Sequence, residues 1–259
     1  MAQGATYTVI QPPHNWALEI ARGNISGQSI ITKFGLNTDV DTGSTPEDIW
    51  SVGGTYVPPT VARVHNIASS SASDTSAGTG ARTVLIRGKD GSYNAVSETV
   101  TLNGTSNVAT ANSYVHIHLM QVSTAGSAAA NVGTISATAQ TDATVTCEIP
   151  VGLNQSVSSI YMVPTGYKAY MMKMRAHMNN STANSNATIQ LLNKPFGGVF
   201  QLKTQITLNN SGSSYIENDY TNSAPFIFQA KSFIKLTCSF VTNNNTQIEG
   251  EYDLILVAD

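Results

Sequence analysis

Hydrophobic and polar residues alternate in short segments along most of this chain. The clearest example is a segment over 82–87, a turn at Gly88–Gly91 and a returning segment over 96–102. In the returning segment Val96, Val100 and Leu102 share one face with Glu98, and hydroxyl side chains occupy the other. Period-two alternation on both sides of an Asp-Gly pair indicates a β-hairpin.

Strands are also predicted in the rest of the chain. The first group is 61–68, 82–87, 96–102, 113–122, 132–139 and 143–149; the second is a strand–turn–strand unit over 159–172, then 186–193, 198–207, 213–218, 226–229, 232–242 and 247–257. Helical periodicity is nearly absent. We therefore predict an all-β protein, with an N-terminal arm over 1–56 followed by two antiparallel, jelly-roll-like β-sandwich domains over 57–154 and 155–259.

The N-terminal arm is predicted because prolines and glycines break residues 1–56 into short pieces. Thr45–Trp50 is predicted to form one helical turn, with Thr45 as N-cap and Pro46 at the first helical position. An aromatic anchor on such a turn suits docking into a pocket of a partner. The expected partner-docking residues are Trp16, Ile49, Trp50 and Tyr56.

The content and balance of charged residues argue against some classes of partner. Charged residues are 11% of the 259 residues, against about 25% in an average soluble domain. The net charge of −3, without a local basic block, argues against nucleic-acid binding. No apolar run is long enough to span a membrane, and the first residues lack the pattern of a secretory signal, so we expect no membrane partner and no such processing.

Two segments have some features of metal sites. His116 and His118 lie two apart on a predicted strand and face the same side, but a third ligand is missing nearby. Asn37–Gly43 with Asp48 has oxygen donors spaced like those of a calcium loop, although its glycine comes one place late. A loop that caps itself with Asp and Thr side chains explains this segment better, so we predict neither a metal nor a cofactor.

Catalytic patterns are also missing. The chain has no Gly-x-Ser-x-Gly motif, its five histidines show no partner arrangement, and Glu98 and Glu148 are expected to be solvated acids on strand faces. We predict that the protein is not an enzyme.

Two further sets of residues leave alternatives open. Tyr215, Tyr220 and Asn243–Asn245 have the chemistry to bind a glycan, but tyrosines at a sandwich rim and asparagines in turns explain them better. Cys147 and Cys238 are expected to be buried free thiols, and the sequence leaves a disulfide between them open.

Several segments resemble a group of tailed-bacteriophage virion structural proteins of the kind found in marine and other environmental phages. They are Thr38–Trp50 with Gly53–Tyr56, Ala72–Arg82, Ser97–Gly104, Val163–Tyr170, Gly197–Phe200 and Tyr252–Val257. In the fourth segment the familiar Gly-Lys is replaced by Gly166-Tyr167-Lys168. Together the segments span most of the chain.

The resemblance implies a virion protein on the capsid surface or the tail, assembled in the host bacterial cytoplasm. We expect a capsid decoration or cement protein that forms a homo-oligomer, with a trimer favoured, and docks through its arm onto the major capsid protein or neighbouring virion proteins. The alternative is a head-fibre or tail-associated protein that binds host-surface glycan.

Overall fold

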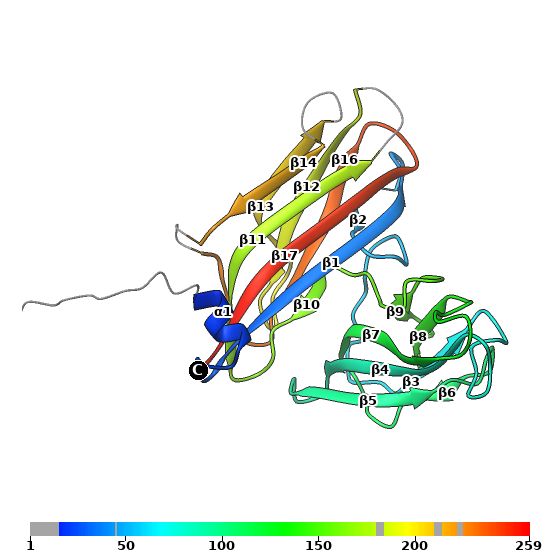
Figure 1. The fold of residues 1–259 in the computed structure, drawn as a ribbon. Coiled ribbons are helices and arrows are strands. Elements are labelled where there is room, and N and C mark those ends of the chain that lie inside the picture. Colours follow the sequence, from blue (N-terminus) through cyan, green and yellow to red (C-terminus); the bar gives the residue numbers. More distant parts are fainter. Residues whose placement is uncertain (1–15, 45, 180–183, 210–213, 222–224) are drawn as a thin grey trace, which may run out of the picture.

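The computed structural model describes residues 16–259 except residues 45, 180–183, 210–213 and 222–224 (Figure 1). Within these residues the chain is all-β apart from a short helix, α1 (Trp16–Ala21). The strands are β1 (Gln28–Val40), β2 (Glu47–Asp48), β3 (His65–Ser69), β4 (Ala81–Lys89), β5 (Ala95–Thr101), β6 (Val108–Ala109), β7 (His116–Ala125), β8 (Ile135–Ala139), β9 (Val145–Ile149), β10 (Ile160–Met162), β11 (Tyr167–Asn179), β12 (Asn186–Lys194), β13 (Gln201–Asn209), β14 (Tyr215–Asp219), β15 (Ile227–Phe228), β16 (Phe233–Val241) and β17 (Thr246–Ala258).

Two five-stranded antiparallel sheets form what we call the large unit. One sheet has the order β1-β17-β11-β14, with β15 also on β11, and the other has the order β10-β16-β12-β13, with β2 also on β16. Alternate residues of both sheets enter one shared core, for example Met171 and Leu254 from the first sheet and Ile189 and Leu236 from the second. Burial of this apolar surface is the main force that holds the two sheets together.

Strands β3–β9 form a separate group, which we call the inserted unit (Figure 1). A four-stranded sheet, β6-β3-β8-β9, and a three-stranded sheet, β5-β4-β7, share a second core that includes Ile67, Ile86, Met120 and Ile149. The strands of this unit lie within the predicted boundaries of 57–154.

The inserted unit interrupts an edge strand of the large unit. Asp48 of β2 pairs with Thr237, and Ile160 of β10 pairs with Lys235 farther along the same strand, β16. Both pairings are antiparallel, so β2 and β10 are two halves of one edge strand. The chain leaves this strand after Asp48 and returns to it at Ile160.

The two connections to the inserted unit are fastened to each other. Trp50 and Ser158 form an antiparallel bridge, and the carbonyl oxygen of Ile49 accepts hydrogen bonds from the backbone N–H (3.0 Å) and hydroxyl (2.8 Å) of Ser159. Gly35 of β1 lies against this point, where a Cβ atom would come within 2.1 Å of the Ile49 carbonyl oxygen and 2.5 Å of the Ser159 nitrogen. Glycine is therefore required there by close backbone approach.

The predicted N-terminal arm differs from the structure over much of its length. Within residues 1–56, β1 pairs with β17 from Gln28↔Val257 to Val40↔Thr246, so it is an integral strand of the large unit. The predicted helical turn at Thr45–Trp50 is also wrong, because Glu47 and Asp48 form β2. Thr45 lies outside the described residues.

The predicted hairpin is confirmed. Strands β4 and β5 pair from Thr83↔Thr101 to Lys89↔Ala95. The turn comes slightly later than expected, because Gly88 and Lys89 still belong to β4, and Asp90 organises the turn by accepting hydrogen bonds from the Ser92 and Asn94 backbone. The later strands also lie close to their predicted positions.

Asp74 holds the loops at one end of the inserted unit. Its carboxylate accepts hydrogen bonds from the Ser69 hydroxyl (2.6 Å) and from the backbone N–H groups of Ala81 (2.7 Å), Val132 (2.9 Å) and Gly133 (2.8 Å). Burial opposes ionisation, but these four donors outweigh it and lower the pKa of Asp74. The buried carboxylate thus joins two segments that lie far apart in the sequence.

Candidate functional site

Three of the four predicted docking residues lie inside the protein. Ile49, Trp50 and Tyr56 are exposed by only 0%, 4% and 2%. Ile49 belongs to the core of the large unit, whereas Trp50 and Tyr56 pack edge to face in a third core with Phe233. The prediction that these three side chains dock onto a partner is therefore wrong, since their apolar surfaces are already buried between parts of the same chain.

Trp16 is the predicted docking residue that remains accessible. It begins α1 and is 43% exposed. Its side chain lies beside Met172 and Ile255 at a depression of about 400 Å³ on the outer face of the β1-β17-β11 sheet. An exposed indole next to apolar side chains is suited to contact with another protein.

The junction between the two units contains buried polar groups as well as the third core. The Tyr56 hydroxyl lies 2.8 Å from Nδ1 of His116, and the Lys33 ammonium donates to the carbonyl oxygen of His118 at 2.5 Å. The Lys89 ammonium lies 5.3 Å from the centre of the Tyr161 ring. Lys33 and Tyr161 belong to the large unit, His116, His118 and Lys89 belong to the inserted unit, and Tyr56 lies in the connection between the two units.

Burial changes the acidity of the basic groups at the junction. It lowers the pKa of Lys33 and of Lys89 to about 8, because a charged ammonium loses its hydration there. Burial also lowers the pKa of His116 and His118 well below its ordinary value, and the two nearby ammonium groups lower it further. Both imidazoles are therefore neutral at pH 7.

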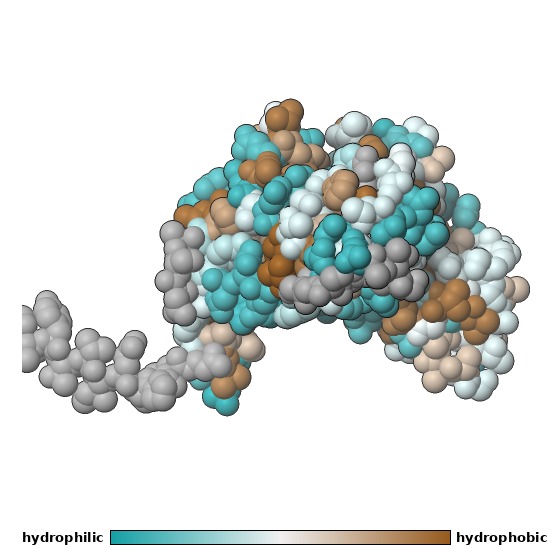
Figure 2. Space-filling view, turned by 90° about the horizontal axis from the view of Figure 1, so that it is seen from above, coloured by the Kyte–Doolittle hydropathy of each residue, from teal (hydrophilic) through white to brown (hydrophobic). Residues whose placement is uncertain are grey.

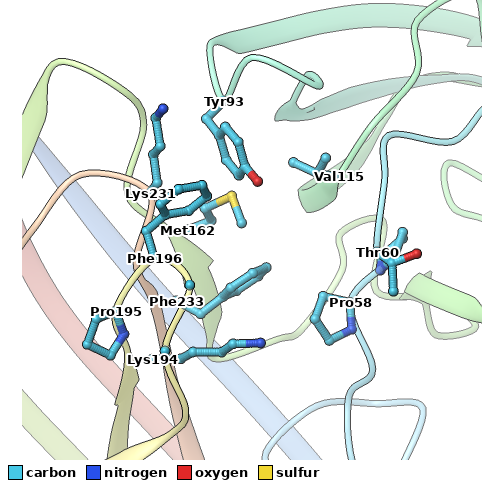
Figure 3. A pocket seen from close by; sticks show the side chains of 13 residues that line it. Pro58, Thr60, Tyr93, Val115, Met162, Lys194, Pro195, Phe196, Lys231 and Phe233 are labelled. Carbon is cyan, nitrogen blue, oxygen red and sulfur yellow. The ribbon is translucent and has the colours of Figure 1, made fainter.

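One side of the junction opens into a cavity of about 330 Å³, which we call the junction pocket (Figure 3). The linker at Pro58–Thr60, Tyr93 and Val115 form one wall. The other wall comes from the large unit and consists of Met162, the loop Lys194–Gly198, Lys231 and Phe233. A volume near the lower end of the range for small-ligand sites, at an interface between two units, makes this pocket the strongest candidate site.

Aromatic rings and ammonium groups lie next to each other in the junction pocket. The rings of Tyr93 and Phe196 are 5.4 Å apart and nearly perpendicular. The Lys231 ammonium lies 5.2 Å from the centre of each ring, and Phe196 is 61% exposed. In Figure 3 the ends of Lys194 and Lys231 lie on opposite sides of the aromatic rings. None of these residues was singled out from the sequence, because they come from loops that only the fold brings together.

The two segments with features of metal sites are used in other ways. Among the described residues, no three His, Cys, Asp or Glu side chains are grouped as metal ligands. His116 and His118 have ring centres 6.3 Å apart. In the calcium-like segment, the Asp48 carboxylate forms an ion pair with Lys235 at 2.7 Å and accepts a hydrogen bond from the Tyr56 backbone N–H.

The predicted acidic and glycan-binding candidates have structural contacts too. Glu98 accepts hydrogen bonds from the backbone of Ala111 (2.7 Å) and Asn112 (2.9 Å) and from the Tyr114 hydroxyl (2.8 Å), which lower its pKa despite burial. Burial raises the pKa of Glu148, which lies on a different sheet, in β9.

The tyrosine and asparagine candidates are dispersed over different elements. Tyr215 is 53% exposed on β14, whereas Tyr220 packs edge to face against Phe226. Asn244, in the loop Asn243–Asn245, accepts hydrogen bonds from Thr42. Cys147 and Cys238 are both buried and free, as predicted.

Comparisons with known proteins leave the family open. No family model and no curated protein matches this chain. A solved structure of the infectious bursal disease virus VP2 subviral particle has 9% identity and a TM-score of 0.21, covering 89% of this chain and 72% of that one. The structure of the Gt strain of the same virus has 9% identity and a TM-score of 0.13, covering 90% and 82%. In the described part, no helix is both long and apolar enough to cross a membrane.

Proposed function

We propose that this chain is a structural protein of a virus particle, in which the large unit packs against neighbours and the inserted unit projects from it. The observation that supports this proposal most is the strand order of the large unit. If β2 and β10 count as one strand, and β14 and β15 as another, the unit has eight strands in chain order. When these eight strands are numbered 1 to 8 along the chain, one sheet has the order 1-8-3-6 and the other has the order 2-7-4-5.

This order is that of a jelly roll, a fold that recurs in viral capsid proteins as well as in lectins and cupins. Among these three classes of protein, the sequence resemblance to tailed-phage virion proteins favours the viral capsid proteins. Fold alone does not specify function. The proposal therefore also depends on the surfaces by which the chain would assemble.

The outer faces of the two large sheets differ in charge. On the face of β1-β17-β11-β14, Arg175 forms ion pairs with Glu217 (2.7 Å), Glu251 (2.6 Å) and Asp253 (2.9 Å). On the face of β12 and β13, Gln190 donates to Gln205 at 3.4 Å. The uncharged glutamines of the second face can pack against another surface of a neighbouring copy without burying an unpaired charge, which suits a homo-oligomer, and we favour a trimer. Figure 2 shows that most of the surface seen from above is hydrophilic or neutral, with apolar residues in separate patches.

The oligomer is tested by placing a charge on the neutral face. Gln205→Lys should lower the mass measured by analytical ultracentrifugation from that of an oligomer to that of the monomer, because a charged ammonium would then be buried at the contact without an acidic partner. Gln247→Lys, on the outer face of the other large sheet, is the matched control and should leave the mass unchanged. A wild-type chain that sediments as a monomer at every concentration would contradict this part of the proposal.

Docking onto the particle is expected to involve Trp16. Antibody against the purified chain should label intact particles of the encoding virus in electron micrographs. Trp16→Ala should reduce co-sedimentation of added protein with particles, whereas Phe240→Ala, which changes another exposed aromatic residue (49%), should not. Equal co-sedimentation of both variants would show that Trp16 does not contribute to docking. Absence of the wild-type chain from purified particles would refute the virion proposal.

A further inference from the structure

Two residues of the junction pocket have a backbone conformation that is unfavourable for their side chains. Tyr93 has φ of 67° and Lys231 has φ of 64°, in the left-handed region that favours glycine. The fold holds both in place: the Tyr93 carbonyl accepts a hydrogen bond from Thr165 (3.0 Å), and the Lys231 N–H donates to the Val163 carbonyl (2.9 Å). Such conformations concentrate at ligand-binding sites, and here they bring a phenol and an ammonium group to the same cavity.

The ammonium groups of the pocket lack acidic partners. Neither Lys194 nor Lys231 forms an ion pair with any carboxylate of the described residues, in contrast to Lys168, Lys173 and Lys235. Lys194 lies 5.9 Å from the centre of the Phe200 ring, and Lys231 lies over the rings of two other aromatic residues. These contacts position the charges, but they leave the N–H donors of both ammonium groups free to bind oxygen atoms of a ligand.

We propose that the junction pocket binds an acidic oligosaccharide. The carboxylates of successive uronic-acid units would accept hydrogen bonds from Lys194 and Lys231, which lie on opposite sides of the aromatic rings (Figure 3). The C–H face of a sugar ring between them stacks on the exposed ring of Phe196, because an aromatic face attracts the weakly positive hydrogens of that face. The hydroxyl-bearing residues Thr60 and Tyr93 also line the pocket and can form hydrogen bonds with sugar hydroxyls.

A peptide and a single-stranded nucleic acid fit the same walls less well. Pro58, Pro59 and Pro195 lack backbone N–H groups, so these walls offer few donors for the main chain of an added peptide strand. Binding of single-stranded nucleic acid needs a basic groove that follows several phosphates. This pocket has two lysines on a chain of net charge −3.

The test uses α-1,4-linked trigalacturonic acid and its methyl ester, titrated into the purified full-length chain by isothermal calorimetry. The two probes have the same sugar rings and linkages, but the ester carries methyl groups in place of the negative charges. The acid should bind the wild-type chain, and the ester should bind at least about tenfold more weakly. Because both titrations use the wild-type protein, their comparison does not depend on whether a variant folds.

Variants then assign the site. Lys194→Met and Lys231→Met should each weaken binding of the acid about tenfold, and Phe196→Ala should weaken binding of both probes. Lys203→Met, on a partly exposed lysine of β13 outside the pocket, should leave the affinity unchanged.

Four results would overturn the assignment: no binding of the acid, equal affinity for acid and ester, wild-type affinity in both pocket lysine variants, or tighter binding of an acidic peptide or an oligothymidylate than of the acid. The measurement uses the chain without particles. Its failure would therefore leave the virion proposal standing, and the failure of that proposal would leave the pocket standing.

Discussion

Lowering the pH from about 7 to about 5 is expected to weaken the junction between the two units, because His116 and His118 are held there in neutral form. Neither ring forms an ion pair with a described carboxylate. The titratable or charged groups that face them are Tyr56, Lys33 of β1, His65 of β3, Arg87 and Lys89 of β4, and Tyr161 of β10. Most of these groups are basic, so protonation of either imidazole would add charge of the same sign.

The sign of the effect follows from proton binding. Because the pKa of His116 and His118 is lowered on folding, the unfolded chain takes up two protons below about pH 6.5 that the folded chain does not. Stability is therefore lost as the pH falls below this value. The loss is at most about 1.4 kcal/mol per histidine and pH unit, which gives up to about 2 kcal/mol for each and up to about 4 kcal/mol for both at pH 5.

The assay is guanidinium unfolding at about pH 7, 6 and 5, a range in which most carboxylates are still ionised. The matched variant is His118→Phe, which keeps a ring against Tyr161 and removes no hydrogen bond of Nδ1, since this atom has no partner among the described residues. The variant should lose less stability than the wild-type chain on acidification, by up to about 2 kcal/mol at pH 5. Equal losses in both proteins, or a wild-type chain that becomes more stable at pH 5, would refute the reasoning.

Three further predictions concern buried contacts. Lys89→Met should raise the free energy of unfolding at pH 7 by about 1–3 kcal/mol, since the lowered pKa of about 8 means that burial of the charged ammonium is unfavourable at this pH. Lys203→Met, on a partly exposed lysine, is the control, and a less stable Lys89→Met chain would contradict this prediction. Gly35→Ala should cost more than about 3 kcal/mol in chemical unfolding or prevent folding, whereas Gly43→Ala, with nothing within 4 Å of the added Cβ, should cost less than about 1 kcal/mol. Asp74→Asn should cost about 2–4 kcal/mol at pH 7, because an amide cannot accept all the hydrogen bonds of the carboxylate; a much smaller loss in the same assay would show that these bonds contribute little.

Local patterns were sufficient to locate most strands. The hairpin of β4 and β5 and the strands from β10 to β17 lie near their predicted positions, because alternation and turn residues act over a few neighbouring residues. Strand β1 was not predicted, because its local pattern is irregular and its pairing partner is distant in the sequence. Its Gly35 and the buried polar side chains of Lys33 and Asn37 interrupt a simple hydrophobic pattern, and its partner β17 lies at the other end of the chain.

The candidate site was also only partly predictable from the sequence. The sequence indicated that Trp50 and Tyr56 are aromatic anchors that fill an apolar pocket. It could not show that they pack against Phe233 of the same chain instead of a partner protein. The junction pocket was invisible in the sequence, because Tyr93 and Lys231 become neighbours only when the two units meet.

The all-β class, the positions of most strands and the low charge of the chain could thus be predicted from the amino-acid sequence. These properties depend on residue type and short-range spacing. Three features become visible only in the folded chain: β2 and β10 are halves of one strand, the inserted unit interrupts this strand, and aromatic rings and ammonium groups share a pocket. Each of these depends on pairing and burial between residues far apart in the chain, where local propensity carries no information about the partner.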